Sequence, residues 1–146
     1  ILGVRTQLID EHLLNETSKG VRQVVILGCG MDYRAFRLPL PPSTVVYEVD
    51  SEDVLATKAS LFRTLYGKQQ HEPVCSVHRV TGDLVRPMEV LHKLRALGLR
   101  TTEPIVWVLE GVLEYLTEAC AVYLLRALSN STSSVHGSTL IAQALD

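Results

Sequence analysis

Apolar and polar positions divide the chain into short apolar runs that alternate with longer stretches of helical periodicity. The short runs occur at residues 24–27, 44–50, 75–80, 104–109 and 138–145. Their length and their β-branched residues are typical of strands, and the fully apolar ones fit strands covered on both faces of a parallel sheet. The run at 75–80 alternates weakly, which predicts a strand nearer the sheet edge.

Between these runs, apolar residues recur at spacings of three and four, which predicts helices. We expect helices over 1–14, 32–38, 52–66, 87–97 and 117–128, and polar connections at 15–22 and 129–134. Ser51 can cap the third helix, and its predicted apolar stripe consists of Val54, Leu55, Leu61, Phe62 and Leu65. Strands that alternate with helices predict an α/β fold with a doubly wound, Rossmann-like, mainly parallel sheet.

A glycine turn follows the first predicted strand. Gly28 and Gly30 remove Cβ atoms where the backbone must turn sharply or let a ligand come close. Twenty residues after Gly30, the second strand ends on Asp50. A glycine turn after one strand and an acid at the tip of the next is an arrangement that binds the ribose of a nucleoside cofactor.

Acidic side chains also follow other predicted strands. Glu48 and Asp50 lie at the end of the second strand, Asp83 follows the third and Glu110 follows the fourth. Ligands of open parallel sheets bind at the carboxyl ends of the strands, beside the point where the strand order reverses. Because four strand ends carry such residues or glycines, we expect one shared ligand site.

Length and charge limit the classes of protein that fit. A chain of 146 residues supports a single domain, 1–146, with one core. Its net charge of −2 gives no electrostatic footprint for nucleic acid or anionic lipid, and its apolar runs are too short for a membrane-spanning helix. The chain begins inside a helical pattern and ends on a strand that would be an exposed edge. We therefore expect a fragment of a larger fold that lacks N-terminal and C-terminal segments.

Cysteine and histidine positions argue against metal and acid–base chemistry. Cys29, Cys75 and Cys120 form no close pair, and no histidine stands at a metal-ligand spacing from them. We expect no metal site and a reducing, cytoplasmic compartment. No histidine lies at a predicted strand end, so we assign no catalytic residue.

The residues around the turn favour a ligand without phosphate. A dinucleotide fingerprint has a third glycine where this chain has Tyr33, and Asp32 would place negative charge at the pyrophosphate position. S-adenosyl-L-methionine carries ribose, adenine, a sulfonium and an ammonium, which suit a ring of carboxylates, and Arg5 could meet its carboxylate. An NAD-dependent oxidoreductase and a non-catalytic Rossmann-like interaction domain stay open as alternatives.

Four blocks of sequence resemble a known family. The strings VVILGCGMDYRAFRL at 24–38, VVYEVD at 45–50, GDL at 82–84 and VLEGVLEYL at 108–116 are similar to the leucine carboxyl methyltransferase family of class I S-adenosylmethionine-dependent methyltransferases. The Arg34-Ala35 pair resembles the branch of bacterial-type O-methyltransferases more than the enzymes that methylate the C-terminal leucine of a protein phosphatase catalytic subunit. The resemblance implies a truncated class I fold with strand order 3-2-1-4-5.

The same resemblance implies roles for individual residues. Arg5 would pair with the methionyl carboxylate, Gly28 would let the backbone pass the methionyl portion, and Glu110 would face the methionyl ammonium. Asp50 would hold the ribose hydroxyls, while Asp83 and Leu84 would contact adenine. We add Gly30 to the cofactor site because it is part of the turn. Cys29 and Glu48 are further, weaker candidates. We expect Arg34 and Arg37 to hold carboxylates and strand ends in place, and Trp107 and Tyr115 to be packing residues.

The resemblance also implies an activity. We expect an S-adenosyl-L-methionine-dependent O-methyltransferase that releases S-adenosyl-L-homocysteine. Its methyl acceptor would be a carboxylate, either a protein C-terminus or a small molecule. A carboxylate acceptor is already ionised, so the transfer would depend on positioning rather than on a general base.

Overall fold

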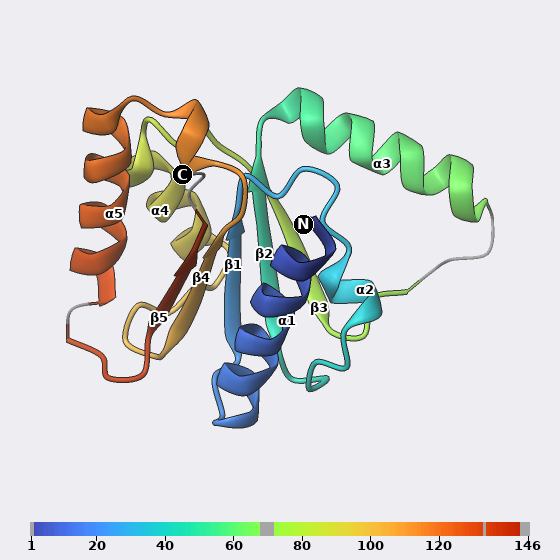
Figure 1. The fold of residues 1–146 in the computed structure, drawn as a ribbon, viewed down its shortest axis with the longest axis horizontal. Helices are drawn as coiled ribbons and strands as arrows, with labels where there is room; N and C mark the ends of the chain where they lie inside the picture. The colour runs from blue at the N-terminus through green and yellow to red at the C-terminus, as the bar shows by residue number, and fades with distance from the viewer. Residues whose placement is uncertain (1, 68–71, 133, 144–146) are drawn as a thin grey trace.

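Five parallel strands form one sheet with helices on both faces (Figure 1). The computed structural model describes residues 2–67, 72–132 and 134–143. The strands are β1 Gln23–Leu27, β2 Val45–Asp50, β3 Ser76–Thr81, β4 Ile105–Leu109 and β5 Thr139–Ala142. Their order is β3-β2-β1-β4-β5. The predicted fold class and strand order are therefore confirmed, and β3 lies at the edge as expected.

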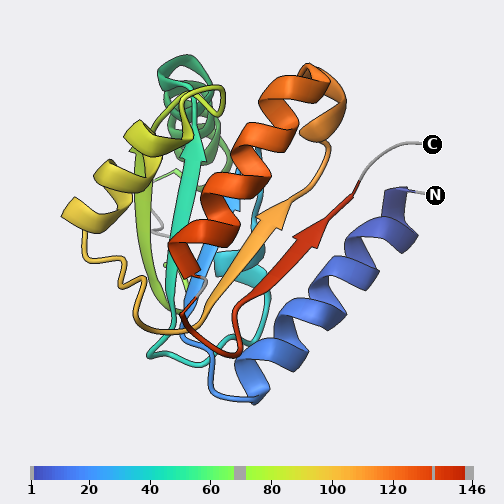
Figure 2. The ribbon, with the colours of Figure 1, turned by 90° about the vertical axis from the view of Figure 1, so that its left-hand side faces the viewer.

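The helices are distributed over the two faces of this sheet (Figures 1 and 2). They are α1 Leu2–Ser18, α2 Arg34–Arg37, α3 Glu52–Tyr66, α4 Pro87–Ala96 and α5 Glu118–Thr132, with a short 3-10 helix, η1, at Leu113–Tyr115. Figure 1 shows α4 and α5 on one side of the sheet and α1, α2 and α3 on the other. Helices on both faces explain why the central strands β1 and β4 are buried along their whole lengths.

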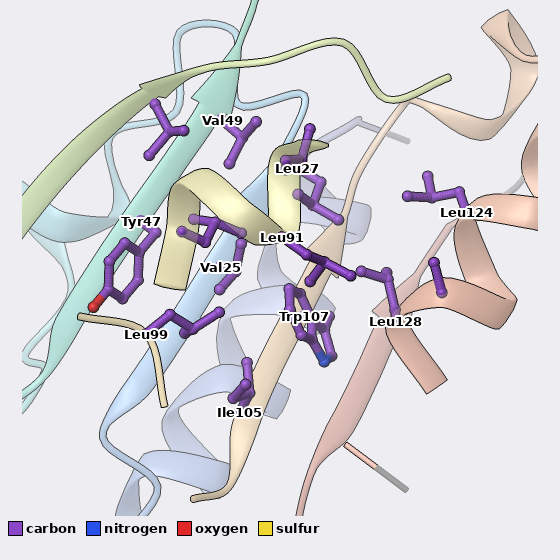
Figure 3. Close-up of a cluster of buried hydrophobic side chains, with 14 of the residues drawn as sticks. Val25, Leu27, Tyr47, Val49, Leu91, Leu99, Ile105, Trp107, Leu124 and Leu128 are labelled. Atoms are coloured by element: carbon purple, nitrogen blue, oxygen red, sulfur yellow. The ribbon is translucent and has the colours of Figure 1, made fainter. Parts of the chain in front are cut away.

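The core between the sheet and helices α4 and α5 consists of hydrophobic side chains (Figure 3). Trp107 of β4 is 2% exposed and lies in this core, so its prediction as a packing residue is confirmed. Other members include Val25, Tyr47, Val49, Leu91, Leu94, Leu124 and Leu128. The charged residues that the structure shows as buried, Asp10, Arg34, Glu48 and Lys58, are not part of this cluster.

The core on the opposite face contains buried charges as well as apolar residues. Ile9 and Leu13 of α1 pack there with strand residues such as Val24 and Val46. Glu48 of β2 and Lys58 of α3 are both 0% exposed and form an ion pair of 2.9 Å. The predicted apolar stripe of α3 is therefore wrong in part, because Leu61 and Leu65 are exposed. Lys58, one turn after Leu55, is buried on this side of the helix instead, where it neutralises Glu48.

Two helices run further than the sequence pattern predicts. Helix α1 extends through the expected polar connection to Ser18, and α5 extends to Thr132. Thr17 and Thr132 are buried in these extensions, and their hydroxyls donate to the carbonyl oxygens of Leu13 and Leu128 at 3.1 and 3.2 Å. Threonine satisfies its hydroxyl within the helix in this way, so a polar composition did not end either helix.

Other boundaries lie close to the predicted ones. Helix α3 matches 52–66, with the Ser51 hydroxyl accepting from the amide of Val54 at 3.3 Å, and the Thr117 hydroxyl accepts from Cys120 at the start of α5. The short helix is confined to Arg34–Arg37. The last strand ends at Ala142, and residues 144 and 145 of its predicted range lie outside the described residues. No helix in the described part of the chain is long and apolar enough to cross a membrane.

Candidate cofactor-binding site

The carboxyl ends of the strands border two adjoining cavities. The first has a volume of about 580 Å³ and lies among α1, the turn after β1 and the end of β4. The second has a volume of about 630 Å³ and lies among the ends of β2 and β3 and the segment after β4. Both are lined by Gly28, Gly111 and Tyr115, so they meet at the glycine turn. Their volumes fall in the usual range for small-molecule sites.

All seven residues predicted to bind the cofactor line one or both of these cavities. Gly28 borders both. The first cavity also contains Arg5, Gly30 and Glu110, and the second contains Asp50, Asp83 and Leu84. The structure thus brings the predicted residues to one edge of the sheet. Their role in holding a ligand stays a prediction.

The two glycines of the turn differ in what surrounds them. Gly28 has φ +68°, and a Cβ there would lie 2.5 Å from the Cγ2 atom of Val112. Gly30 has φ +49°, and a Cβ there would meet no atom within 4 Å. Packing inside the protein therefore already excludes a side chain at Gly28, whereas at Gly30 only the backbone conformation favours glycine. The amide of Gly28 also donates to the carbonyl of Val49 at 2.8 Å, which ties the turn to β2.

Asp50 closes the turn from the second strand. Its Oδ2 accepts from the amide of Gly30 and its Oδ1 from the amide of Ser51, each at 2.8 Å. Backbone donors therefore orient the carboxylate at the wall of the second cavity. Each oxygen retains acceptor capacity for a further donor, because a carboxylate offers about four acceptor positions. A vicinal diol could use those positions.

The rest of the second cavity combines charged side chains with an apolar wall. Its charged residues are Glu52, Asp83, Arg86, Glu89 and Lys93. The Oδ1 atom of Asp83 accepts from the amide of Val85 at 3.1 Å, which fixes the carboxylate after β3. Leu84, Val112 and Leu116 contribute apolar surface to the same cavity. A flat, largely apolar ring with an exocyclic amino group would find both a surface and an acceptor here.

The first cavity is bordered by a network of ion pairs. Arg34 is 3% exposed, and its guanidinium contacts three carboxylates: Asp10 at 2.7 Å, Glu110 at 2.7 Å, and Asp32. Arg5 contacts Glu110 at 3.0 Å, and Arg37 contacts Asp10 at 2.6 Å. Three guanidinium groups thus face three carboxylates, so the network is balanced in formal charge. The expectation that Arg34 and Arg37 hold carboxylates in place agrees with these contacts.

The environment of Arg34 keeps it charged. Burial alone lowers the pKa of an arginine, but the attraction of Asp32 and the hydrogen bonds to Asp10 and Glu110 outweigh it, so the pKa of Arg34 lies above its ordinary value. Asp32 also accepts from the backbone amide of Arg34 at 2.8 Å. Its negative charge is therefore directed at Arg34, and α2 after it has only four residues.

Glu48 and Cys29 do not behave as candidate ligand groups. Glu48 pairs with Lys58 and with Arg79 at 3.1 Å and lines neither cavity, so it alternates to the packed face of β2. Cys29 borders the first cavity but is 5% exposed. Burial is the main cause that raises the pKa of its thiol to about 12, which keeps it protonated and unreactive.

Tyr115 contradicts its prediction as a packing residue. It lies at the end of η1, is 84% exposed and borders both cavities. The mostly apolar block 108–116 predicts burial at this position, whereas its place five residues beyond a strand-end acid is a signal for the site. Among the described residues, no group of three or more His, Cys, Asp or Glu side chains could hold a metal ion.

The sequence profile of the leucine carboxyl methyltransferase family matches residues 1–129. The chain belongs to this family. Among its relatives, a protein of Mycolicibacterium gilvum is 44% identical over 115 residues, which are 79% of this chain and 36% of that protein. A protein of Parafrankia sp. is 40% identical over 124 residues, which are 85% of this chain and 38% of that protein. Both are provisionally named S-adenosyl-L-methionine-dependent methyltransferases.

Two solved structures share the fold. A methyltransferase-like protein of Thermobifida fusca superposes with a TM-score of 0.69 at 21% identity, over 93% of this chain and 50% of that one. A DUF574 family protein of Streptomyces avermitilis gives a TM-score of 0.68 at 20% identity, over 93% of this chain and 52% of that one. This chain therefore spans about half the length of those two structures and about two fifths of the length of the curated relatives.

Proposed function

We propose that the protein binds S-adenosyl-L-methionine across the two cavities and serves as an O-methyltransferase that acts on a carboxylate. The observation that carries this proposal is the division of the site at Gly28 into a cavity bordered by ion pairs and a cavity with apolar walls and oriented acids. That division corresponds to a cofactor with a zwitterionic amino acid at one end and an adenosine at the other. Membership of the family supports the same reading.

The first cavity would hold the amino-acid end of the cofactor. Arg5 and Glu110 contact each other at 3.0 Å, so each already lies opposite a group of the charge that the ligand would bring. Arg5 would turn to the methionyl carboxylate, and Glu110 would accept from the ammonium. Because the ligand end is itself a zwitterion, the exchange conserves the charge balance of the network.

The second cavity would hold the adenosine. Asp50 would accept from the ribose hydroxyls with the acceptor positions that Gly30 and Ser51 leave free. Asp83 would accept from the adenine amino group, and Leu84 would contact the ring face. These contacts favour a nucleoside without phosphate, because this cavity is lined by four carboxylate side chains and only two cationic ones.

The bound cofactor would supply a methyl group activated by a sulfonium. The residues of this chain contribute binding and orientation, and positioning of this kind can supply ~7 kcal/mol or more of rate advantage. We assign no general base, because a carboxylate acceptor is ionised at neutral pH. Tyr115, at the junction of the cavities, is placed to contact the acceptor.

An NAD-dependent oxidoreductase is a weaker candidate. The helix after the turn has four residues, and Asp32 stands before it. A pyrophosphate site needs the free amides of a longer helix N-terminus and no adjacent carboxylate.

Calorimetric titration with S-adenosyl-L-homocysteine tests the cofactor, with NADH as the matched control ligand. We expect saturable binding of the first and none of the second. Binding of NADH alone, or of neither compound by a folded protein, would contradict the proposal. Transfer of labelled methyl groups to a panel of carboxylic acids and C-terminal peptides tests the acceptor class, and a protein that binds the cofactor without any transfer would favour the non-catalytic alternative.

A further inference from the structure

We propose that Arg34 is a positioning residue that orients Glu110 toward the amino end of the cofactor. The proposal rests on the cofactor site proposed above and adds to it a residue that borders the cavity but acts through another side chain. It accounts for a guanidinium that is 3% exposed and yet contacts three separate segments of the chain.

The contacts of Glu110 divide its two oxygens. Oε2 accepts from Nη2 of Arg34 at 2.7 Å, while Oε1 accepts from Nε of Arg5 at 3.0 Å and, at 3.5 Å, from the hydroxyl of Thr6. Arg34 is the more buried of the two arginines, since the Arg34 side chain is 4% exposed and that of Arg5 is 27% exposed. Arg34 therefore fixes one oxygen, and the other is left for the partner that can move when a ligand enters.

Arg34 is in turn held in place by two other carboxylates. Its Nε donates to Asp10 of α1 at 2.7 Å, and its Nη1 donates to Asp32 in the turn after β1. Helix α1, the turn and the end of β4 are thus joined through one planar group. Lysine carries the same charge but presents its donors from a single nitrogen, so it cannot span three carboxylates in this geometry.

The test compares Arg34→Lys with the unchanged protein for two ligands. S-adenosyl-L-homocysteine has the amino-acid end, and 5′-methylthioadenosine lacks it. We expect Arg34→Lys to weaken the first on the order of 10- to 100-fold, the range for a hydrogen bond to a charged group, and to leave the second within about twofold. Arg79→Lys is the matched control, because Arg79 pairs with Glu48 away from both cavities, and it should change neither ligand.

A double-mutant cycle with Glu110→Gln separates positioning from a general structural role. If Arg34 acts through Glu110, Arg34→Lys should cost little further affinity for S-adenosyl-L-homocysteine once Glu110 is Gln. Equal losses for both ligands, or full additivity of the two substitutions, would overturn the proposal. If Arg34→Lys does not fold, Asp10→Ala removes one contact of Arg34 and one of Arg37, and leaves Glu110 intact. It should weaken S-adenosyl-L-homocysteine several-fold relative to 5′-methylthioadenosine, and an unchanged ratio would count against the proposal.

The outcome is distinguishable from failure of the proposed function. If the unchanged protein binds neither ligand, the cofactor assignment is wrong and the role of Arg34 is wrong with it. If the unchanged protein binds S-adenosyl-L-homocysteine and Arg34→Lys binds it equally well, only the role of Arg34 is wrong.

Discussion

The two cavities at the carboxyl edge of the sheet hold their charged groups by different means. In the first, Arg34 and Arg5 reach Glu110 across 76 and 105 residues of sequence. In the second, the carboxylates of Asp50 and Asp83 are oriented by backbone amides, and each accepts from an amide one or two residues further on. Only the Asp50 contact with the amide of Gly30 spans 20 residues.

This difference indicates that the first cavity depends more than the second on the packing of the whole domain. The ion-paired cavity requires α1, the turn after β1 and the end of β4 to be in place together. The acids of the second cavity are oriented mainly by backbone amides at the strand ends, so they depend less on contacts between distant elements. Substitutions in the first cavity should therefore weaken the binding of ligands that have an amino-acid end and leave the binding of ligands without one unchanged.

Gly28→Ala should have the largest effect, a loss of stability at the residue where the two cavities meet. The new Cβ would lie 2.5 Å from Val112 and would also occupy a positive φ. Overpacking and backbone strain together should lower the free energy of unfolding by ~2–5 kcal/mol, measured by urea denaturation. Gly30→Ala is the control, with a cost of ~1–2 kcal/mol from φ alone. Equal costs at the two positions would show that Val112 moves aside easily.

Asp50→Ala should weaken the binding of both ligands. Loss of the acceptor for two ribose hydroxyls is expected to weaken S-adenosyl-L-homocysteine and 5′-methylthioadenosine alike, each on the order of 100-fold, as determined by calorimetry. Asp53→Ala is the control, since Asp53 is an exposed carboxylate in the first turn of α3 that lines neither cavity. Retention of 5′-methylthioadenosine binding by Asp50→Ala would place the ribose elsewhere.

Arg5→Gln should distinguish the cavities. It removes the proposed partner of the methionyl carboxylate and leaves Glu110 paired with Arg34. We expect S-adenosyl-L-homocysteine to bind on the order of 10-fold more weakly and 5′-methylthioadenosine to bind unchanged. Lys19→Gln removes an equal charge just beyond the other end of α1 and serves as the control. A loss that is the same for both ligands would argue that Arg5 acts on the fold rather than on the amino-acid end.

The smallest expected effect is the slow reaction of the Cys29 thiol with a labelling reagent. The pKa of its thiol is raised to about 12 from 9.0, chiefly by burial, so at pH 8 only about one thiol in 10⁴ is ionised in the folded protein. We expect iodoacetamide to label Cys120, which is partly exposed, before Cys29, as read by peptide mass spectrometry. The stability that the neutral thiol contributes is complete below pH 9 and falls as the pH rises toward 12, because only the unfolded thiol ionises there. Rapid labelling of Cys29 at pH 8 would contradict this burial.

Much of the architecture follows from local sequence. Four apolar residues ahead of Gly28 predict a buried strand because the run has the length of a strand and three of its residues are β-branched. Ser51 and Thr117 mark helix starts because their hydroxyls satisfy free amides within three residues. The residues at strand ends could also be predicted to lie at one edge, because all strands of a parallel sheet end on the same side.

Long-range pairing could not be predicted from the same patterns. Lys58 lies where α3 was expected to be apolar, and its burial makes sense only with Glu48 of β2 beside it. The apolar block 108–116 predicts that Tyr115 packs, yet within the described part of the chain its side chain is 84% exposed. The extensions of α1 and α5 were missed because a polar composition does not reveal which threonine hydroxyls bond within their own helix.

The sequence by itself determined the alternation of strands and helices, the glycine turn and the acids at the strand ends, since each depends on residues close together in the chain. Tertiary structure decided which charges neutralise which. Arg34 contacts Asp10 and Glu110, which lie 24 and 76 residues away, and such contacts form only when the sheet order brings α1, β1 and β4 together. Charge pairing acts through space, so the sequence names the charged residues and the fold selects their partners.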